Sequence, residues 1–275
     1  MNTVPRSTRC FVAGTLASGT ERILPAGPSA HLARVLRLRA GAALTLFNGE
    51  GGEFEAQIVA LDRDGVRVRV GAHLRLEREA PMAVTLMQCL ARGERMDWIV
   101  QKATELGVAV IVPVASEHSV VRLDEAGAQR RHQHWQAVAI SACEQCGRNR
   151  LPEIRTALSF APACADDQRR HPQGERAQRE YPRLVLAPGA PDSLAALLGA
   201  RGANAPAGLA VAGLSLLIGP EGGLSATELT IAQDHGFMSC RLGPRILRAE
   251  TAPLAALATI QALLGDFGER NTDTN

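Results

Sequence analysis

The sequence predicts an α/β protein in which a mostly parallel sheet, covered by helices on both faces, follows a small β-rich barrel. Residues 1–75 hold short stretches of alternating hydrophobicity, separated by turn signals such as Asn48-Gly49 and Asp64-Gly65. From residue 80 onward strands and helices alternate, which is the pattern of a parallel sheet with crossover helices. The charged stretch Leu76–Pro81 ends in proline and is the expected linker. We therefore expect two domains, residues 1–75 and 80–268.

The first domain is expected to contain three strands and one helix. The strands are Ala43–Phe47, Phe54–Val59 and Val66–Val70. The helix begins at the N-cap Ser29, ends at Gly41, and has an apolar stripe of Leu32, Val35 and Leu36. Arginines are spread over the domain at Arg6, Arg9, Arg34, Arg37, Arg39, Arg67 and Arg69. A solvated face is the ordinary explanation for such arginines, but a barrel with an arginine-lined side is also a common RNA-binding module.

The second domain is expected to contain five buried strands joined by helices. The strands are Val84–Leu90, Val108–Val114, Leu184–Ala187, Leu214–Ile218 and Phe237–Leu242. Helices are expected over Met96–Leu106 with a stop at Gly107, around Trp135–Ala142 with a stop at Gly147, after the capping box Ser225–Glu228, and over Thr251–Leu264. Two stretches poor in large apolar residues, 161–182 and 199–213, are interpreted as surface insertions.

Bulk properties narrow the class of protein. The 275 residues are 46% hydrophobic and 21% charged, with a net charge of +2 and a single lysine, Lys102. No apolar run approaches the ~20 residues of a membrane span, and the N-terminus does not resemble a secretory signal, so we expect a cytoplasmic protein. The six cysteines include one lone C-x-x-C, Cys143–Cys146, without the second pair that a zinc site needs. We expect neither a metal site nor a disulfide framework.

Ligands of open parallel sheets bind at the carboxyl ends of the strands, where three loops qualify. These loops are Leu186–Ala190, Gly219–Gly223 and Leu242–Arg248. The glycine-rich second loop lacks the G-K-[ST] of a phosphate-binding loop and does not match G-x-G-x-x-G. Because Glu221 would also repel a pyrophosphate, an adenosine-like ligand with hydroxyls and a cationic centre fits this loop better than a triphosphate or dinucleotide.

The third loop carries two arginines, Arg245 and Arg248. They belong either to a solvated helix start or to a site that grips a phosphate or a polarised base. The histidines His118 and His235 stand alone in the sequence, and no Ser-His-Asp or Cys-His set is visible, so we expect both to be structural.

The loop sequences resemble those of the SPOUT methyltransferases, most closely the bacterial 16S rRNA (uracil-N3) methyltransferase family. The resemblance covers nearly the whole chain. It rests on Leu217-Ile-Gly-Pro-Glu-Gly-Gly-Leu-Ser225, Leu242-Gly-Pro-Arg-Ile-Leu-Arg-Ala-Glu-Thr-Ala252, Arg95–Gly107, Trp135–Arg148, Arg9–Val12 and the helix Leu32–Arg37. Two residues depart from the family pattern: Cys146 replaces an expected serine and His118 an expected arginine.

The resemblance implies a trefoil-knotted domain that binds S-adenosylmethionine (SAM) and a PUA-like barrel that binds RNA. The implied cofactor-binding residues are Leu186, Ala187, Gly219, Pro220, Glu221, Gly222, Leu242, Gly243, Ile246, Leu247 and Arg248. The implied RNA-binding residues are Arg9, Arg34 and Arg37. A homodimer is also implied, with the helix Thr251–Leu264 either in its interface or in the ordinary core.

The implied reaction is methylation of N3 of a uridine in the 16S rRNA of the 30S subunit, uridine 1498 by the resemblance. Arg248 and Arg245 are the candidates for stabilising charge that develops on the uracil oxygens. Glu221 is the third catalytic candidate: it could orient the cofactor, support the following helix or act as the base. Two alternatives remain: a SPOUT ribose 2′-O-methyltransferase and a non-enzymatic RNA-binding protein.

Overall fold

The chain divides into two compact units. The computed structural model describes residues 8–119, 125–171, 181–199 and 211–267. The N-terminal unit comprises Met1–Glu79 and Ile140–Leu151, and the C-terminal unit comprises Ala80–Ala139 and Pro152–Asn275. The division between residues 79 and 80 falls inside the expected linker. Nothing in the sequence pattern indicated that residues 140–151 would group with the N-terminal unit.

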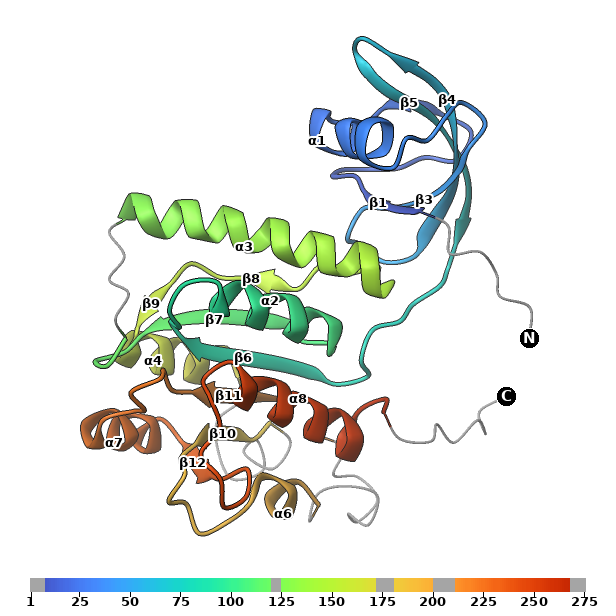
Figure 1. Ribbon diagram of the computed structural model, residues 1–275. Helices are drawn as coiled ribbons and strands as arrows, with labels where there is room; N and C mark the ends of the chain where they lie inside the picture. The colour runs from blue at the N-terminus through green and yellow to red at the C-terminus, as the bar shows by residue number, and fades with distance from the viewer. Residues whose placement is uncertain (1–7, 120–124, 172–180, 200–210, 268–275) are drawn as a thin grey trace, which may run out of the picture. The chain divides into compact units, whose positions relative to one another are not determined.

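The N-terminal unit is built on a five-stranded sheet with the order β1-β3-β4-β5-β2, coloured blue to cyan in Figure 1. The strands are β1 Thr8–Phe11, β2 Glu21–Ile23, β3 Ala43–Phe47, β4 Glu53–Asp62 and β5 Gly65–Leu74. The three predicted strands are confirmed as β3, β4 and β5, and the last two are longer than expected. Alternate residues of these strands, among them Leu46, Ile58 and Val68, form the core of the unit. Among the described residues the sheet stays open, because β1 pairs only with β3 and β2 only with β5.

The helix of this unit differs from the prediction. Helix α1, Ala26–Ala30, continues into a π-helical turn, His31–Val35. Ser29 is not the N-cap: it is buried inside α1, where its Oγ donates to Leu24 O at 2.9 Å and accepts from Val66 N at 3.0 Å. Of the expected apolar stripe only Leu32 is buried, whereas Val35 is 67% exposed. The wider π turn shifts the helical register, so residues spaced for an α-helix leave the buried face.

The C-terminal unit contains a seven-stranded sheet with the order β12-β10-β11-β6-β7-β8, in which β9 also pairs with β7. All described pairings are parallel, as predicted. The strands are β6 Ala83–Cys89, β7 Val110–Ala115, β8 Glu153–Ile154, β9 Leu158–Ser159, β10 Arg183–Leu186, β11 Gly213–Ile218 and β12 Phe237–Cys240. The five expected strands are present, and the two-residue strands β8 and β9 were not predicted because they are too short to show a periodicity.

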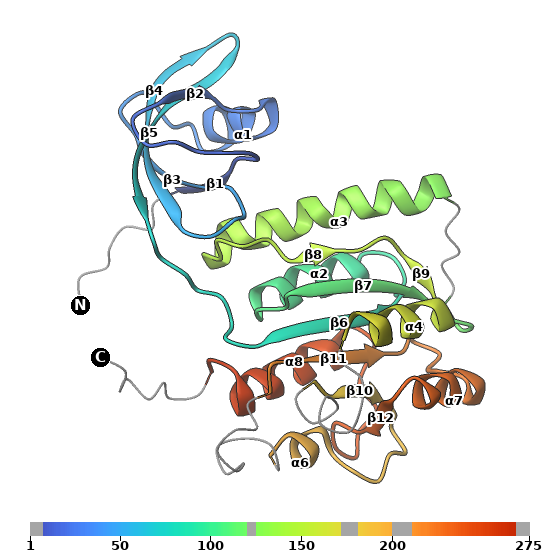
Figure 2. The ribbon, with the colours of Figure 1, turned by 180° about the vertical axis from the view of Figure 1, so that it is seen from behind.

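Helices cover both faces of this sheet, as predicted (Figure 2). The first face packs against α2 Arg95–Glu105, α3 Glu125–Cys146, α6 Leu194–Gly199 and α8 Thr251–Leu264. The second face packs against α4 Phe160–Arg170 and α7 Ala226–Asp234. Helices α2 and α3 stop before Gly107 and Gly147, whose φ angles of +81° and +94° lie in the left-handed region that ends helices. Helix α8 has the predicted bounds.

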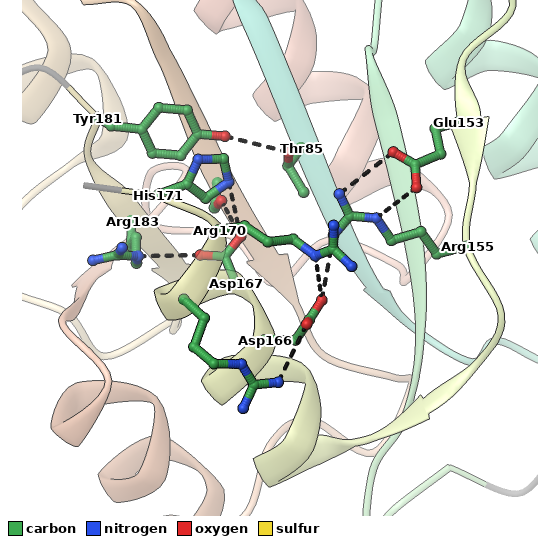
Figure 3. Close-up of polar contacts among 11 residues, drawn as sticks. Thr85, Glu153, Arg155, Asp166, Asp167, Arg170, His171, Tyr181 and Arg183 are labelled. Atoms are coloured by element: carbon green, nitrogen blue, oxygen red, sulfur yellow. Dashed lines mark hydrogen bonds and ion pairs between the residues drawn. The ribbon is translucent and has the colours of Figure 1, made fainter. Parts of the chain in front are cut away.

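Helix α4 corrects the interpretation of residues 161–182 as a surface insertion. Residues 172–180 lie outside the described part of the chain, but Ala163 and Cys164 of α4 are buried in the core. Asp167 is buried as well, and its carboxylate accepts from Ser215 Oγ at 2.5 Å. It also accepts from Arg183 Nε at 3.1 Å (Figure 3). Small side chains let α4 pack closely on the sheet, so a scarcity of large apolar residues did not signal exposure. Most of the second insertion, residues 200–210, is outside the described residues.

Three further observations concern the described residues alone. No helix among them is long and apolar enough to cross a membrane. They contain no group of three or more side chains suited to hold a metal ion. All six cysteines lie among them, and no disulfide joins any two.

Candidate functional site

The three loops expected to bind a ligand converge on one pocket of about 790 Å³ in the C-terminal unit. Strands β12, β10 and β11 are neighbours in that order and run parallel, so their carboxyl ends meet at one edge of the sheet. The lining comprises residues 186–188, 218–224, 240–243 and 245–250 together with Arg95, Leu229 and Ala252. All the expected cofactor-binding residues, from Leu186 to Arg248, therefore line the same cavity.

Glycines in these loops allow close approaches that other residues would prevent. A Cβ atom on Gly222 would lie 2.9 Å from Cβ of His118, which is too close for two carbon atoms that do not bond. Gly243 has φ +93°, a conformation that residues with side chains rarely adopt. The glycine content thus shapes the pocket walls and leaves backbone groups exposed to a ligand.

Glu221 is held by the start of helix α2. Its Oε1 accepts from Arg95 Nη1 at 2.6 Å and from the Arg92 amide at 3.1 Å. Burial raises the pKa of Glu221, but hydrogen bonds from backbone amides and from Arg95 outweigh it, and the pKa lies below the ordinary value for glutamate. A carboxylate bound in this way is a poor proton acceptor. These contacts favour an anchoring role for Glu221 over the role of a base.

Glu221 does not support the following helix, α7, which has its own cap. The predicted capping box is confirmed: Ser225 Oγ accepts from the Glu228 amide at 3.2 Å, and the Glu228 carboxylate accepts from the Ser225 amide at 3.0 Å. Of the three roles considered for Glu221, helix support is therefore the least consistent with the structure.

Glu250 is an acidic pocket residue that the sequence reasoning did not select. It precedes α8 at the N-cap position and lines the pocket. Its Oε2 atom is buried, accepts no hydrogen bond from a described residue, and lies 3.6 Å from Arg95 Nε. The only sequence signal was its place in the third loop motif, because no periodicity or charge pattern distinguishes it from a solvated helix start.

Arg245 and Arg248 lie on the pocket wall formed by the third loop. Both are exposed, and their guanidinium groups make no hydrogen bond or ion pair with any described residue. Arg241, in contrast, donates to the carbonyl oxygens of Ala190 and Pro191. The two selected arginines are thus the lining cations available to a ligand.

The two lone histidines have different surroundings. His235 Nδ1 lies 2.8 Å from Ile231 O inside α7, which fits the structural role expected for it. His118 is exposed, and its Nδ1 lies 3.1 Å from Gly223 O in the pocket loop. His118 therefore contacts the glycine-rich loop itself, which its isolation in the sequence did not indicate.

The three arginines expected to bind RNA lie in two different environments. Arg9 is largely buried: it donates to Glu53 Oε2 at 2.5 Å, to Asn149 Oδ1 at 2.6 Å and to Arg148 O at 3.1 Å. Its guanidinium is committed within the N-terminal unit, which argues against a surface role. Arg34 and Arg37 are exposed and remain candidates.

Comparisons with known proteins agree with one another. A model described as "RNA methyltransferase domain" matches residues 78–261, and one described as "RNA methyltransferase PUA domain" matches residues 29–71. The chain is 30% identical to ribosomal RNA small subunit methyltransferase E of Bacillus subtilis, over 84% of this chain and 85% of that protein. It is 29% identical to the protein of the same name from Mycobacterium tuberculosis, over 93% and 92%.

Solved structures are similar over almost the full length. A methyltransferase of Legionella pneumophila in complex with SAM has 34% identity and a TM-score of 0.82, covering 95% of this chain and 99% of that one. Ribosomal RNA small subunit methyltransferase E of Neisseria gonorrhoeae, bound to SAM, has 32% identity and a TM-score of 0.78, covering 95% and 100%.

Proposed function

Because the chain belongs to the RNA methyltransferase family whose domain model matches residues 78–261, we propose that it methylates N3 of a uridine in 16S rRNA, uridine 1498. The chain is a SAM-dependent rRNA methyltransferase of this family. The finer proposal is supported by the relatives named as small-subunit enzymes, which match most of its length. The observation that carries it is the pocket built by the three loops at one edge of the sheet.

The residues of the pocket fit SAM. Leu186, Leu242, Ile246 and Leu247 offer an apolar surface for an adenosine group, and Glu221 and Glu250 offer negative charge for a cation. No lysine lines the pocket, so it lacks the usual partner of a triphosphate. The eleven residues expected to bind the cofactor would hold it, with Ala187, Gly219, Pro220, Gly222 and Gly243 contributing backbone groups. When bound, SAM supplies a methyl group activated by its positively charged sulfur.

The protein's own contribution to the reaction is to position the base and to stabilise charge. Negative charge develops on the uracil ring as the N3 proton leaves, and donors aimed at the carbonyl oxygens stabilise it. Arg248 and Arg245 are exposed on the pocket wall and carry out this role in the proposal. Glu221 anchors its loop to the start of α2 through Arg95 and Arg92.

RNA is held by the PUA-like unit in this proposal. Arg34 and Arg37 are exposed beside Val35 and Leu36, and such a mixture suits phosphates and unstacked bases. The target uridine must leave its stack before N3 can reach the pocket. A knotted course of the chain around the pocket, a homodimer and a cytoplasmic location complete the proposal. The return of β12 to pair with β10 is consistent with a knotted course.

The deciding experiment incubates the protein with labelled SAM and 30S subunits from a strain that lacks the modification. Nucleoside analysis should give 3-methyluridine. A 2′-O-methylated nucleoside would replace the proposal with ribose methylation, and absence of SAM binding in a titration would leave an RNA-binding protein without enzymatic activity.

A further inference from the structure

Two carboxylates in the pocket share one guanidinium group. Arg95 makes its short contact with Glu221, at 2.6 Å, and its longer contact with Glu250, at 3.6 Å. The hydrogen bond with Glu221, followed by the charge of Glu250, raises the pKa of Arg95, so it stays a cation. One positive and two negative charges leave this group with a net negative charge, and Glu250 is its less compensated member.

The less compensated carboxylate, Glu250, lines the pocket and is partly buried, with 21% of its side chain exposed. Glu250 Oε2 is buried and accepts no hydrogen bond from a described residue. The other lining cations form no ion pair with Glu250: Arg241 directs its guanidinium to the carbonyl oxygens of Ala190 and Pro191, and Arg245 and Arg248 are exposed, where water and salt screen their charge. A buried charge acts on a ligand in the pocket more strongly than exposed ones do.

We infer that Glu250 makes the pocket prefer the positively charged cofactor over the uncharged product that remains after methyl transfer. The inference rests on the proposed function. Methyl transfer breaks the bond between sulfur and the methyl carbon and forms the bond between that carbon and N3, while the N3 proton passes to solvent water. The sulfur keeps the electron pair of the broken bond, so S-adenosylhomocysteine (SAH) has lost the positive charge that SAM carried. Glu250 therefore attracts SAM, and this attraction is lost when SAM becomes SAH.

The size of the effect follows from Coulomb's law. Unit charges ~8–12 Å apart, at an effective dielectric constant of ~20, attract each other enough to change affinity about 10- to 30-fold. SAH is a neutral thioether and lacks this contribution, and apart from the transferred methyl group it can make the same contacts as SAM. The change in the ratio Kd(SAH) over Kd(SAM) when the Glu250 charge is removed therefore isolates the effect of that charge.

The test compares these dissociation constants by isothermal titration calorimetry in the full chain and in three variants. Glu250→Gln should lower the ratio Kd(SAH) over Kd(SAM) about 10- to 30-fold, mainly by weakening the binding of SAM. Glu250→Asp keeps the charge and should stay within about three-fold of the parent ratio. Glu94→Gln is the matched control, because Glu94 is exposed next to Arg95 and does not line the pocket, and its ratio should be unchanged.

Equal weakening of SAM and SAH in Glu250→Gln would overturn the inference, since a merely structural glutamate affects both ligands alike. If this variant does not fold, the inference is tested on the parent protein by measuring the affinity of sinefungin, a SAM analogue that carries an amine cation. Sinefungin must bind more tightly than SAH, and equal affinity refutes the charge effect. A parent protein that binds neither SAM nor SAH would instead refute the proposed function.

Discussion

Replacement of Arg9 by alanine should destabilise the N-terminal unit without directly removing an RNA contact. The side chain is 12% exposed and donates to three acceptors: Glu53 Oε2, Asn149 Oδ1 and Arg148 O. Glu53 keeps a second partner, Arg78 Nη1 at 3.1 Å, so it does not become an isolated charge. The other two acceptors lose a donor at ~1 kcal/mol or more each, and the weakened buried ion pair brings the total cost to about 3 kcal/mol.

Hydrogen–deuterium exchange measured by mass spectrometry tests this prediction. Tryptophan fluorescence would not report on the N-terminal unit, because both tryptophans lie in the C-terminal unit. Peptides from β3, β4 and residues 140–151 should exchange faster in Arg9→Ala, while peptides from β11 should not change. Arg34→Ala is the control: it should leave exchange unchanged and weaken RNA binding. Unchanged exchange in Arg9→Ala, combined with a loss of RNA affinity equal to that of Arg34→Ala, would refute the reasoning.

Four further predictions test the pocket and the buried charges. Arg248→Ala should abolish methylation while calorimetry finds SAM affinity within a few-fold of the parent; surviving activity would contradict its role. Gly219→Val should block SAM binding in the same assay, because even a Cβ at this position lies 3.1 Å from Leu224 Cγ. Asp167→Ala should lower the free energy of unfolding by about 3–5 kcal/mol, because the buried Arg183 loses its carboxylate partner; urea unfolding monitored by tryptophan fluorescence measures this. Burial raises the pKa of Glu53, but hydrogen bonds and charge from Arg9 and Arg78 lower it by more, so the net pKa lies below the ordinary value of 4.5. The contribution of Glu53 to the free energy of unfolding should therefore be retained above about pH 4.5 and lost in an acid titration as the pH falls through the lowered pKa.

Long periodic elements could be predicted from the sequence, whereas elements that depend on local irregularity or close packing could not. Helix α8 has the predicted bounds, because its apolar residues recur at helical spacing over fourteen positions. The same reasoning misplaced Ser29, since a π-helical turn follows it and its hydroxyl bonds to distant backbone groups. Helix α4 was missed because alanine and cysteine fill its interface with the sheet, and the periodicity of large apolar residues is weak there.

The location of the site was predictable from the topology, but the partners of its charged residues were not. Parallel strands bring their following loops to one edge, so the three loops could be selected from the order of elements alone. Glu221 and Arg95 are separated by 126 positions, and Arg9 and Asn149 by 140. No local pattern connects residues so far apart. An arginine that binds RNA and one that binds a buried glutamate are therefore indistinguishable until the fold brings their neighbours together.

The charges of the pocket fall into two zones that match the two reactants of the proposed reaction. The first zone contains Glu221, Glu250 and the cation that pairs with both, Arg95, and so favours a positively charged methyl donor. The second zone contains Arg245 and Arg248, exposed and unpaired among the described residues, and so favours a polyanion and a base that becomes negative. Because one loop carries both arginines and ends at Glu250, its conformation sets both zones at once. A change in the backbone conformation of that loop should therefore alter cofactor affinity and turnover together. Loss of the Arg248 side chain alone should reduce turnover, and a change in Arg34 or Arg37 should alter RNA affinity alone.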